Sequence, residues 1–201
     1  MNRRKFLAIL AVIMPSTAIA HSPWGQFQVY RQKHLLILTS REDEESYPYS
    51  KLLAVALNRE QPNASARPAR AINLKRVYNL LRTKQFTFTL LPRNHLELLE
   101  AMDLDNTKSQ YRLDLSPIYT FGDLVFLVQN DFDTNLVRIV THSLAESAIW
   151  LPDADSPLDV LANKKRPPGA YEALEKFNSQ KSISRISLSV FGSLNQSTPI
   201  L

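Results

Sequence analysis

The residue with the most distinctive capacity for chemistry is His21. If a signal peptidase cuts the chain after Ala20, His21 carries a free α-amino group, and this amine and the imidazole can chelate one metal ion together. A second histidine would complete a three-nitrogen copper site of the histidine-brace type, and the candidates are His34, His95 and His142. Nitrogen ligands bind Cu(II) most tightly among the divalent first-row ions. The alternative is that His21 follows the cleavage point by chance and that the other three histidines cap helices or face solvent.

A second group of polar side chains surrounds the start of a predicted helix. Ser46, Tyr47, Tyr49 and Ser50 follow the acidic run 42–45. Helix N-termini favour anions, so these hydroxyl groups could contact a small anionic ligand; alternatively, the two aromatic rings pack against the helix. The acidic run could attract a cation, but its position before the helix favours an interaction with the helix dipole.

Several classes of chemistry are excluded by composition. The 201 residues include no Cys, which rules out disulfides, thiolate metal sites and cysteine nucleophiles. The four glycines are too widely spaced for a phosphate-binding loop, and no serine lies in a Gly-x-Ser-x-Gly turn. No pair of carboxylates is placed to divide the roles of acid and base. We therefore expect a protein that is not an enzyme.

Residues 1–20 have the pattern of a signal peptide. A basic start is followed by an apolar stretch over 6–14 and by small residues at 18–20. The pair Arg3-Arg4 before Phe6-Leu7 resembles a twin-arginine (Tat) signal, but ordinary Sec signals also begin with basic residues, so both routes stay open. Either route predicts a periplasmic protein.

The net charge of the whole chain is +5, from 24 basic and 19 acidic residues. Three of the basic residues and none of the acidic ones lie in 1–20, so the remainder has a net charge of +2. A charge this small over the exported chain gives no reason to expect nucleic acid as a partner.

The elements that must position these side chains alternate between strand and helix. This alternation over 34–177 predicts an α/β domain with a mostly parallel sheet flanked by helices. Residues 21–33 are expected to be an N-terminal arm with aromatic residues, and 178–201 a C-terminal tail that is either an edge strand around 183–190 or disordered. Four strands are expected: 35–39, 86–91, 119–129 and a short strand within 62–70. Five helices are expected: 52–60, 74–81, 96–102 (after Asn94 as N-cap), 136–150 and 170–177.

Four pieces of this sequence, in this order, carry a family resemblance: 47–54, 80–90, 124–133 and 168–171. Their motifs are Tyr-Pro-Tyr-Ser-Lys-Leu-Leu-Ala, Leu-Leu-Arg-Thr-Lys-Gln-Phe-Thr-Phe-Thr-Leu, Leu-Val-Phe-Leu-Val followed by Asp-Phe-Asp, and Pro-Gly-Ala-Tyr. The chain thereby resembles the TAXI-type solute-binding proteins of TRAP transporters, which have a type II periplasmic-binding fold. The chain is shorter than these proteins, and the missing stretch falls between Met102 and Pro117, where the family has most of its second lobe.

The resemblance implies a single periplasmic-binding-protein-like lobe whose small-molecule ligand would contact Ser46, Tyr47, Tyr49 and Ser50. We therefore expect a non-catalytic periplasmic solute-binding-like module. Without a second lobe, it could also dock on a periplasmic or membrane protein, or on a second copy of itself, through the surface that the lobe would have covered. The alternative is a periplasmic copper-binding protein that uses His21.

Overall fold

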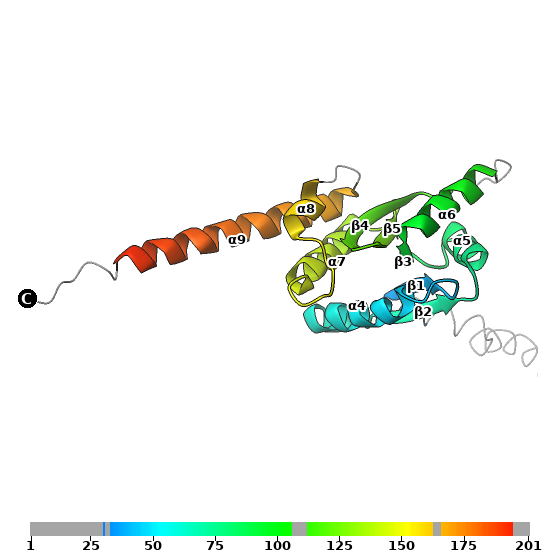
Figure 1. The fold of residues 1–201 in the computed structure, drawn as a ribbon, viewed down its shortest axis with the longest axis horizontal. Helices are drawn as coiled ribbons and strands as arrows, with labels where there is room; N and C mark the ends of the chain where they lie inside the picture. The colour runs from blue at the N-terminus through cyan, green and yellow to red at the C-terminus, as the bar shows by residue number, and fades with distance from the viewer. Residues whose placement is uncertain (1–29, 31–32, 106–111, 163–165, 195–201) are drawn as a thin grey trace, which may run out of the picture.

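The computed structural model describes residue 30 and residues 33–105, 112–162 and 166–194, of which 182–194 are described as backbone only. His21, the expected signal peptide and most of the expected arm 21–33 lie outside the described residues. Figure 1 shows a mixed sheet with helices on both faces and one long helix that runs away from this body. No helix in the described part of the chain is both long and apolar enough to cross a membrane.

The sheet has five strands, in the order β2-β1-β3-β5-β4. β1 pairs in parallel with β2 and β3, whereas β5 runs antiparallel to both β3 and β4. The α/β class with flanking helices is confirmed, but the sheet is mixed, so the expected mostly parallel arrangement holds only for its first three strands. The strands are β1 (Leu36–Ser40), β2 (Arg67–Ala71), β3 (Phe88–Pro92), β4 (Leu115–Phe121) and β5 (Leu124–Gln129).

The antiparallel part arises from a hairpin where one strand over 119–129 was expected. β4 and β5 are joined by a tight turn at Gly122 and Asp123, and Phe121 pairs with Leu124. Gly122 has φ +56°, a left-handed conformation that glycine adopts without steric cost. The single-strand prediction was wrong because only these two residues interrupt an otherwise apolar run.

The helices form one layer on each face of the sheet. Alternate residues of β1 point to opposite faces: Ile37 packs in the core with α4, α7 and α9, while Leu36 and Leu38 pack with α5 and α6. The helices are α4 (Ser46–Glu60), the short 3₁₀ helix η1 (Pro62–Ala64), α5 (Leu74–Arg82), α6 (Arg93–Asp105), α7 (Thr134–Ser147), α8 (Pro157–Ala162) and α9 (Pro168–Leu194).

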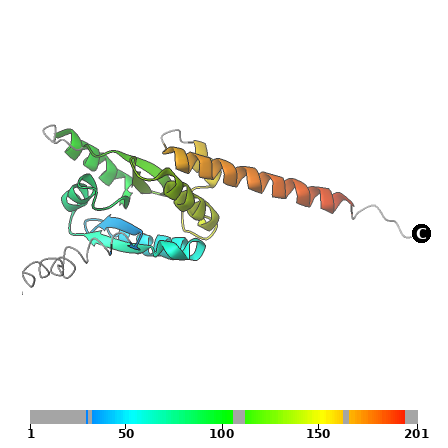
Figure 2. The ribbon, with the colours of Figure 1, turned by 180° about the vertical axis from the view of Figure 1, so that it is seen from behind.

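The C-terminal part of the chain differs from the expectation. The last helix was expected to end near residue 177, with an edge strand around 183–190, but α9 continues to Leu194 and that strand does not form. α9 packs against α7 and then extends beyond the α/β body, as both views show (Figures 1 and 2). The apolar positions Ile183, Ile186 and Val190 are spaced three and four apart, so they fit a helix at least as well as a strand. In the same way, Asn94 is not an N-cap, because α6 begins directly after β3.

Candidate functional site

Three buried polar atoms without a hydrogen-bond partner belong to residues that follow the carboxyl ends of β1 and β3. They are Asp43 Oδ2, Ser46 Oγ and His95 Nδ1. Asp43 and Ser46 lie at the start of α4, directly after β1, and His95 lies in the first turn of α6, directly after β3. Because β1 and β3 are parallel neighbours, these two helix starts come together at one edge of the sheet. We call these three residues the Asp43 site.

The geometry at this edge couples an acid to an imidazole. Asp43 Oδ2 lies 3.8 Å from His95 Nδ1, and their side chains are only 9% and 14% exposed. The other carboxylate oxygen, Asp43 Oδ1, accepts a 2.6 Å hydrogen bond from the backbone N–H of Ser46 and so caps α4. One oxygen of Asp43 therefore fixes the helix, while the second stays available to a donor.

Glu42 performs a comparable role for the next helix. Glu42 Oε2 accepts a 2.7 Å hydrogen bond from the backbone N–H of Leu74, the first residue of α5. The Asn73 side chain caps the same helix by accepting from the N–H of Arg76. Two members of the acidic run thus lie at helix N-termini, in agreement with the dipole interpretation of that run. The described residues contain no group of three or more His, Asp or Glu side chains that could hold a metal ion.

The expected ligand-binding residues separate into different environments. Ser46 belongs to the Asp43 site, but the Ser50 hydroxyl donates to the backbone oxygen of Tyr47, 2.7 Å away within α4. The Tyr49 hydroxyl donates to the backbone oxygen of Pro152, and its ring packs 4.9 Å from that of Phe121. Tyr49 and Ser50 are therefore engaged in contacts within the protein.

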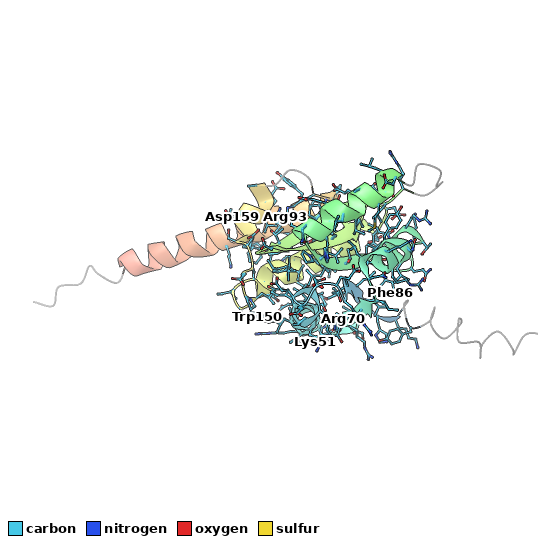
Figure 3. The ribbon with its side chains drawn as sticks, turned by 45° about the vertical axis from the view of Figure 1, so that its right-hand side comes forward. Lys51, Arg70, Phe86, Arg93, Trp150 and Asp159 are labelled. Carbon is cyan, nitrogen blue, oxygen red and sulfur yellow. The ribbon has the colours of Figure 1, made fainter. Side chains whose placement is uncertain are left out.

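Tyr47 lies beside two cations. Lys51 Nζ and Arg70 Cζ lie 4.7 Å and 4.9 Å from the centre of its ring, close enough for cation–π interactions. Figure 3 labels Lys51, which belongs to α4, and Arg70, which belongs to β2, near each other. Tyr47 is therefore engaged by two cations, while the exposed residues beside Asp43 include Glu44 and Glu45 of the acidic run.

A separate polar cluster fastens the segment after α7 to β4. The Tyr119 hydroxyl donates a 2.9 Å hydrogen bond to the backbone oxygen of Asp155. The Arg166 guanidinium donates two 2.6 Å hydrogen bonds, one to the backbone oxygen of Ile118 and one to that of Val160. Burial lowers the pKa of Arg166 and, together with the Asp155 carboxylate, raises the pKa of Tyr119. These groups satisfy one another, so we assign this cluster to stability.

The three histidines proposed as partners of His21 lie on different elements. His34 precedes β1, and its Nδ1 lies 3.2 Å from the backbone oxygen of Ser65. His95 belongs to the Asp43 site, and His142 Nε2 lies 4.0 Å from Glu146 within α7. The role of His95 beside Asp43 was missed because it depends on β1 and β3 being neighbours, which the sequence does not state.

No family model, curated protein or solved structure matches this chain.

Proposed function

We propose that the chain is a non-catalytic periplasmic solute-binding module, similar to one lobe of a TAXI-type receptor, that binds a small polar ligand at the Asp43 site. The re-entry of the chain into the sheet as β4 and β5, with β5 antiparallel to β3, agrees with the lobe and hinge strand that the resemblance implies. Only a short segment separates α6 from β4, where a second lobe would be inserted.

The observation that carries this proposal is that buried side-chain atoms of Asp43, Ser46 and His95 make no hydrogen bond, with Asp43 Oδ2 and His95 Nδ1 lying 3.8 Å apart. A buried polar atom without a hydrogen bond costs about 1–3 kcal/mol, so a polar ligand that supplies these hydrogen bonds would be stabilised here. Ligands of α/β sheets bind outside the carboxyl ends of the strands, which is where these atoms lie. The ligand would donate a hydrogen bond to Asp43 Oδ2 and exchange hydrogen bonds with Ser46 Oγ and His95 Nδ1.

The test measures binding of a panel of small amines, amino acids and hydroxy acids to the chain from residue 21 by calorimetry. Ser46→Ala and His95→Ala should each weaken the best ligand about tenfold, the effect of one lost hydrogen bond to a polar group. Glu44→Gln is the matched control, because Glu44 is exposed in the same acidic run. Binding that is unchanged in both site variants, or the absence of any ligand in the panel, would contradict this proposal.

A copper-binding function through His21 is the second candidate, and one observation favours it. His34 Nδ1 is directed to the backbone oxygen of Ser65, which leaves Nε2 as its metal-binding nitrogen. In this proposal, the His21 α-amine, its imidazole and His34 Nε2 hold Cu(II). Adding one residue before His21, or replacing His34 with Ala, should abolish tight Cu(II) binding; retention of one copper by both variants in native mass spectrometry would exclude the site.

A further inference from the structure

A cavity lies at the end of the sheet opposite the Asp43 site. The residues before β1 and β3, the end of α4 and one face of α7 enclose a cavity of about 550 Å³. We call it the amino-end cavity, because it lies at the amino ends of these parallel strands. Its size falls within the range of cavities that hold small organic ligands.

The interior of the amino-end cavity is apolar. Phe88 and Phe132 line it with their rings edge to face, 5.2 Å between centres, and Leu57 and Val140 complete the buried wall. Leu136 and Ile139 of α7 also line it, although they are 48% and 38% exposed. An occupant with an apolar body would remove these two side chains from water, which is favourable by about 25 cal/mol for each Å² covered.

The described lining of the amino-end cavity includes one exposed lysine. Lys33 and His34 line the cavity together with the amide side chains of Gln61 and Asn63, and no Asp or Glu is among its described lining residues. His34 directs Nδ1 to the backbone oxygen of Ser65, which fixes the ring. An exposed lysine beside neutral amide donors complements a carboxylate. A ligand with a carboxylate at one end and an apolar body would therefore match both the lysine and the apolar interior.

We propose that the amino-end cavity binds an apolar monocarboxylate of the fatty-acid class. The hydrocarbon chain contacts Phe88, Phe132, Leu136 and Ile139, and the carboxylate lies beside Lys33. This site is independent of the Asp43 site, because the two lie at opposite ends of β1 and β3.

The test uses dodecanoate as the probe, below its micellar concentration, in calorimetric titrations of the chain from residue 21. One molecule of dodecanoate should bind per chain. Ile139→Trp places an indole at the cavity wall and should weaken binding at least about tenfold. Leu52→Trp, at an equally exposed position of α4 outside the cavity lining, should leave it unchanged.

The role of the charge is tested with a neutral analogue. Lys33→Gln should weaken dodecanoate binding about fivefold, the upper range for an exposed ion pair, and leave binding of dodecanol unchanged. An equal affinity of Ile139→Trp and the parent chain, or an equal loss for both ligands in Lys33→Gln, would overturn the proposal. A further outcome would also overturn the proposal: dodecanoate binds a chain that starts at Tyr30 but does not bind the chain that starts at residue 21. The cavity of the longer chain would then be occupied by its own aromatic N-terminal arm.

Discussion

Glu42 Oε2 accepts a hydrogen bond from the backbone N–H of Leu74, 32 positions further along the chain. The loop after β1 thereby caps α5, a helix that starts after β2. Replacing Glu42 with Ala should lower the free energy of unfolding by about 1 kcal/mol, the usual cost of a lost N-cap, and Glu42→Gln should cost less because its amide oxygen can still accept. Urea unfolding measures both, and Glu44→Ala is the exposed control; equal values for Glu42→Ala and the control would contradict the cap.

The contact of α9 with α7 depends on Gly169. A Cβ atom at this position would overlap the backbone oxygen of Thr134 and crowd the backbone nitrogen of Arg138. Gly169→Ala should therefore lower the free energy of unfolding by about 2–3 kcal/mol, because backbone atoms must move. Gly122→Ala is a useful comparison, because its Cβ atom would lie at an ordinary contact distance, 3.5 Å from the Cβ atom of Asp153. Only the left-handed backbone at this position disfavours alanine, so the substitution should lower the free energy of unfolding by about 1–2 kcal/mol. A Gly169→Ala protein as stable as its parent would contradict this packing.

Stability should fall in alkaline solution because of two tyrosines. Burial raises the pKa of Tyr49 and Tyr119, and the nearby carboxylates of Asp153 and Asp155 raise them further. In the unfolded chain both phenols ionise near pH 10, whereas the folded protein keeps them protonated. Their stabilising contribution is therefore complete below pH 10 and is lost as the pH rises above it.

The corresponding measurement is the urea midpoint at pH 8 and at pH 10.5. The midpoint should decrease for the parent chain and decrease less for Tyr119→Phe, which cannot ionise. Tyr171→Phe, at an exposed tyrosine, serves as the control and should behave like the parent. An equal decrease of the urea midpoint in all three proteins would show that the buried phenols do not cause the loss of stability at alkaline pH.

Arg166 should not tolerate replacement by lysine. Its planar guanidinium donates to backbone oxygens of both β4 and α8, which a single ammonium group cannot reach with the same geometry. Arg166→Lys should lower the free energy of unfolding by about 1–3 kcal/mol, because at least one buried carbonyl loses its donor. Arg59→Lys, on the exposed face of α4, should have no measurable effect; similar values for the two variants would contradict the role of Arg166.

The sequence predicted the elements that have an uninterrupted hydrophobic period. The helix over 74–81 was found because its apolar residues are spaced three and four apart, and β1 because it is apolar throughout. The β4–β5 hairpin was missed because a two-residue turn hardly interrupts such a run. The length of α9 was missed because a Ser-rich segment with isolated apolar residues fits two periods at once.

The candidate site was found only in part. Ser46 was identified from its place at a helix start, and the structure puts it in the Asp43 site. Asp43 was interpreted as a partner of the helix dipole, which describes Oδ1 but not Oδ2. The proximity of His95 follows from the order of strands in the sheet, and strand order is a property of the tertiary fold that the spacing of residues along one chain does not encode.

The order of strands also determines how this protein meets its neighbours. Both edge strands contain a proline, Pro68 in β2 and Pro117 in β4, and the pairing of β4 is irregular next to Pro117. Proline has no N–H to offer to a further strand, and the outer edge of β4 is partly covered by its bridge to Ala154. Each edge strand therefore lacks one N–H donor, which disfavours strand addition on both sides of the sheet. Assembly of this chain through its helices and loops is favoured over the edge-to-edge pairing to which open sheets are exposed.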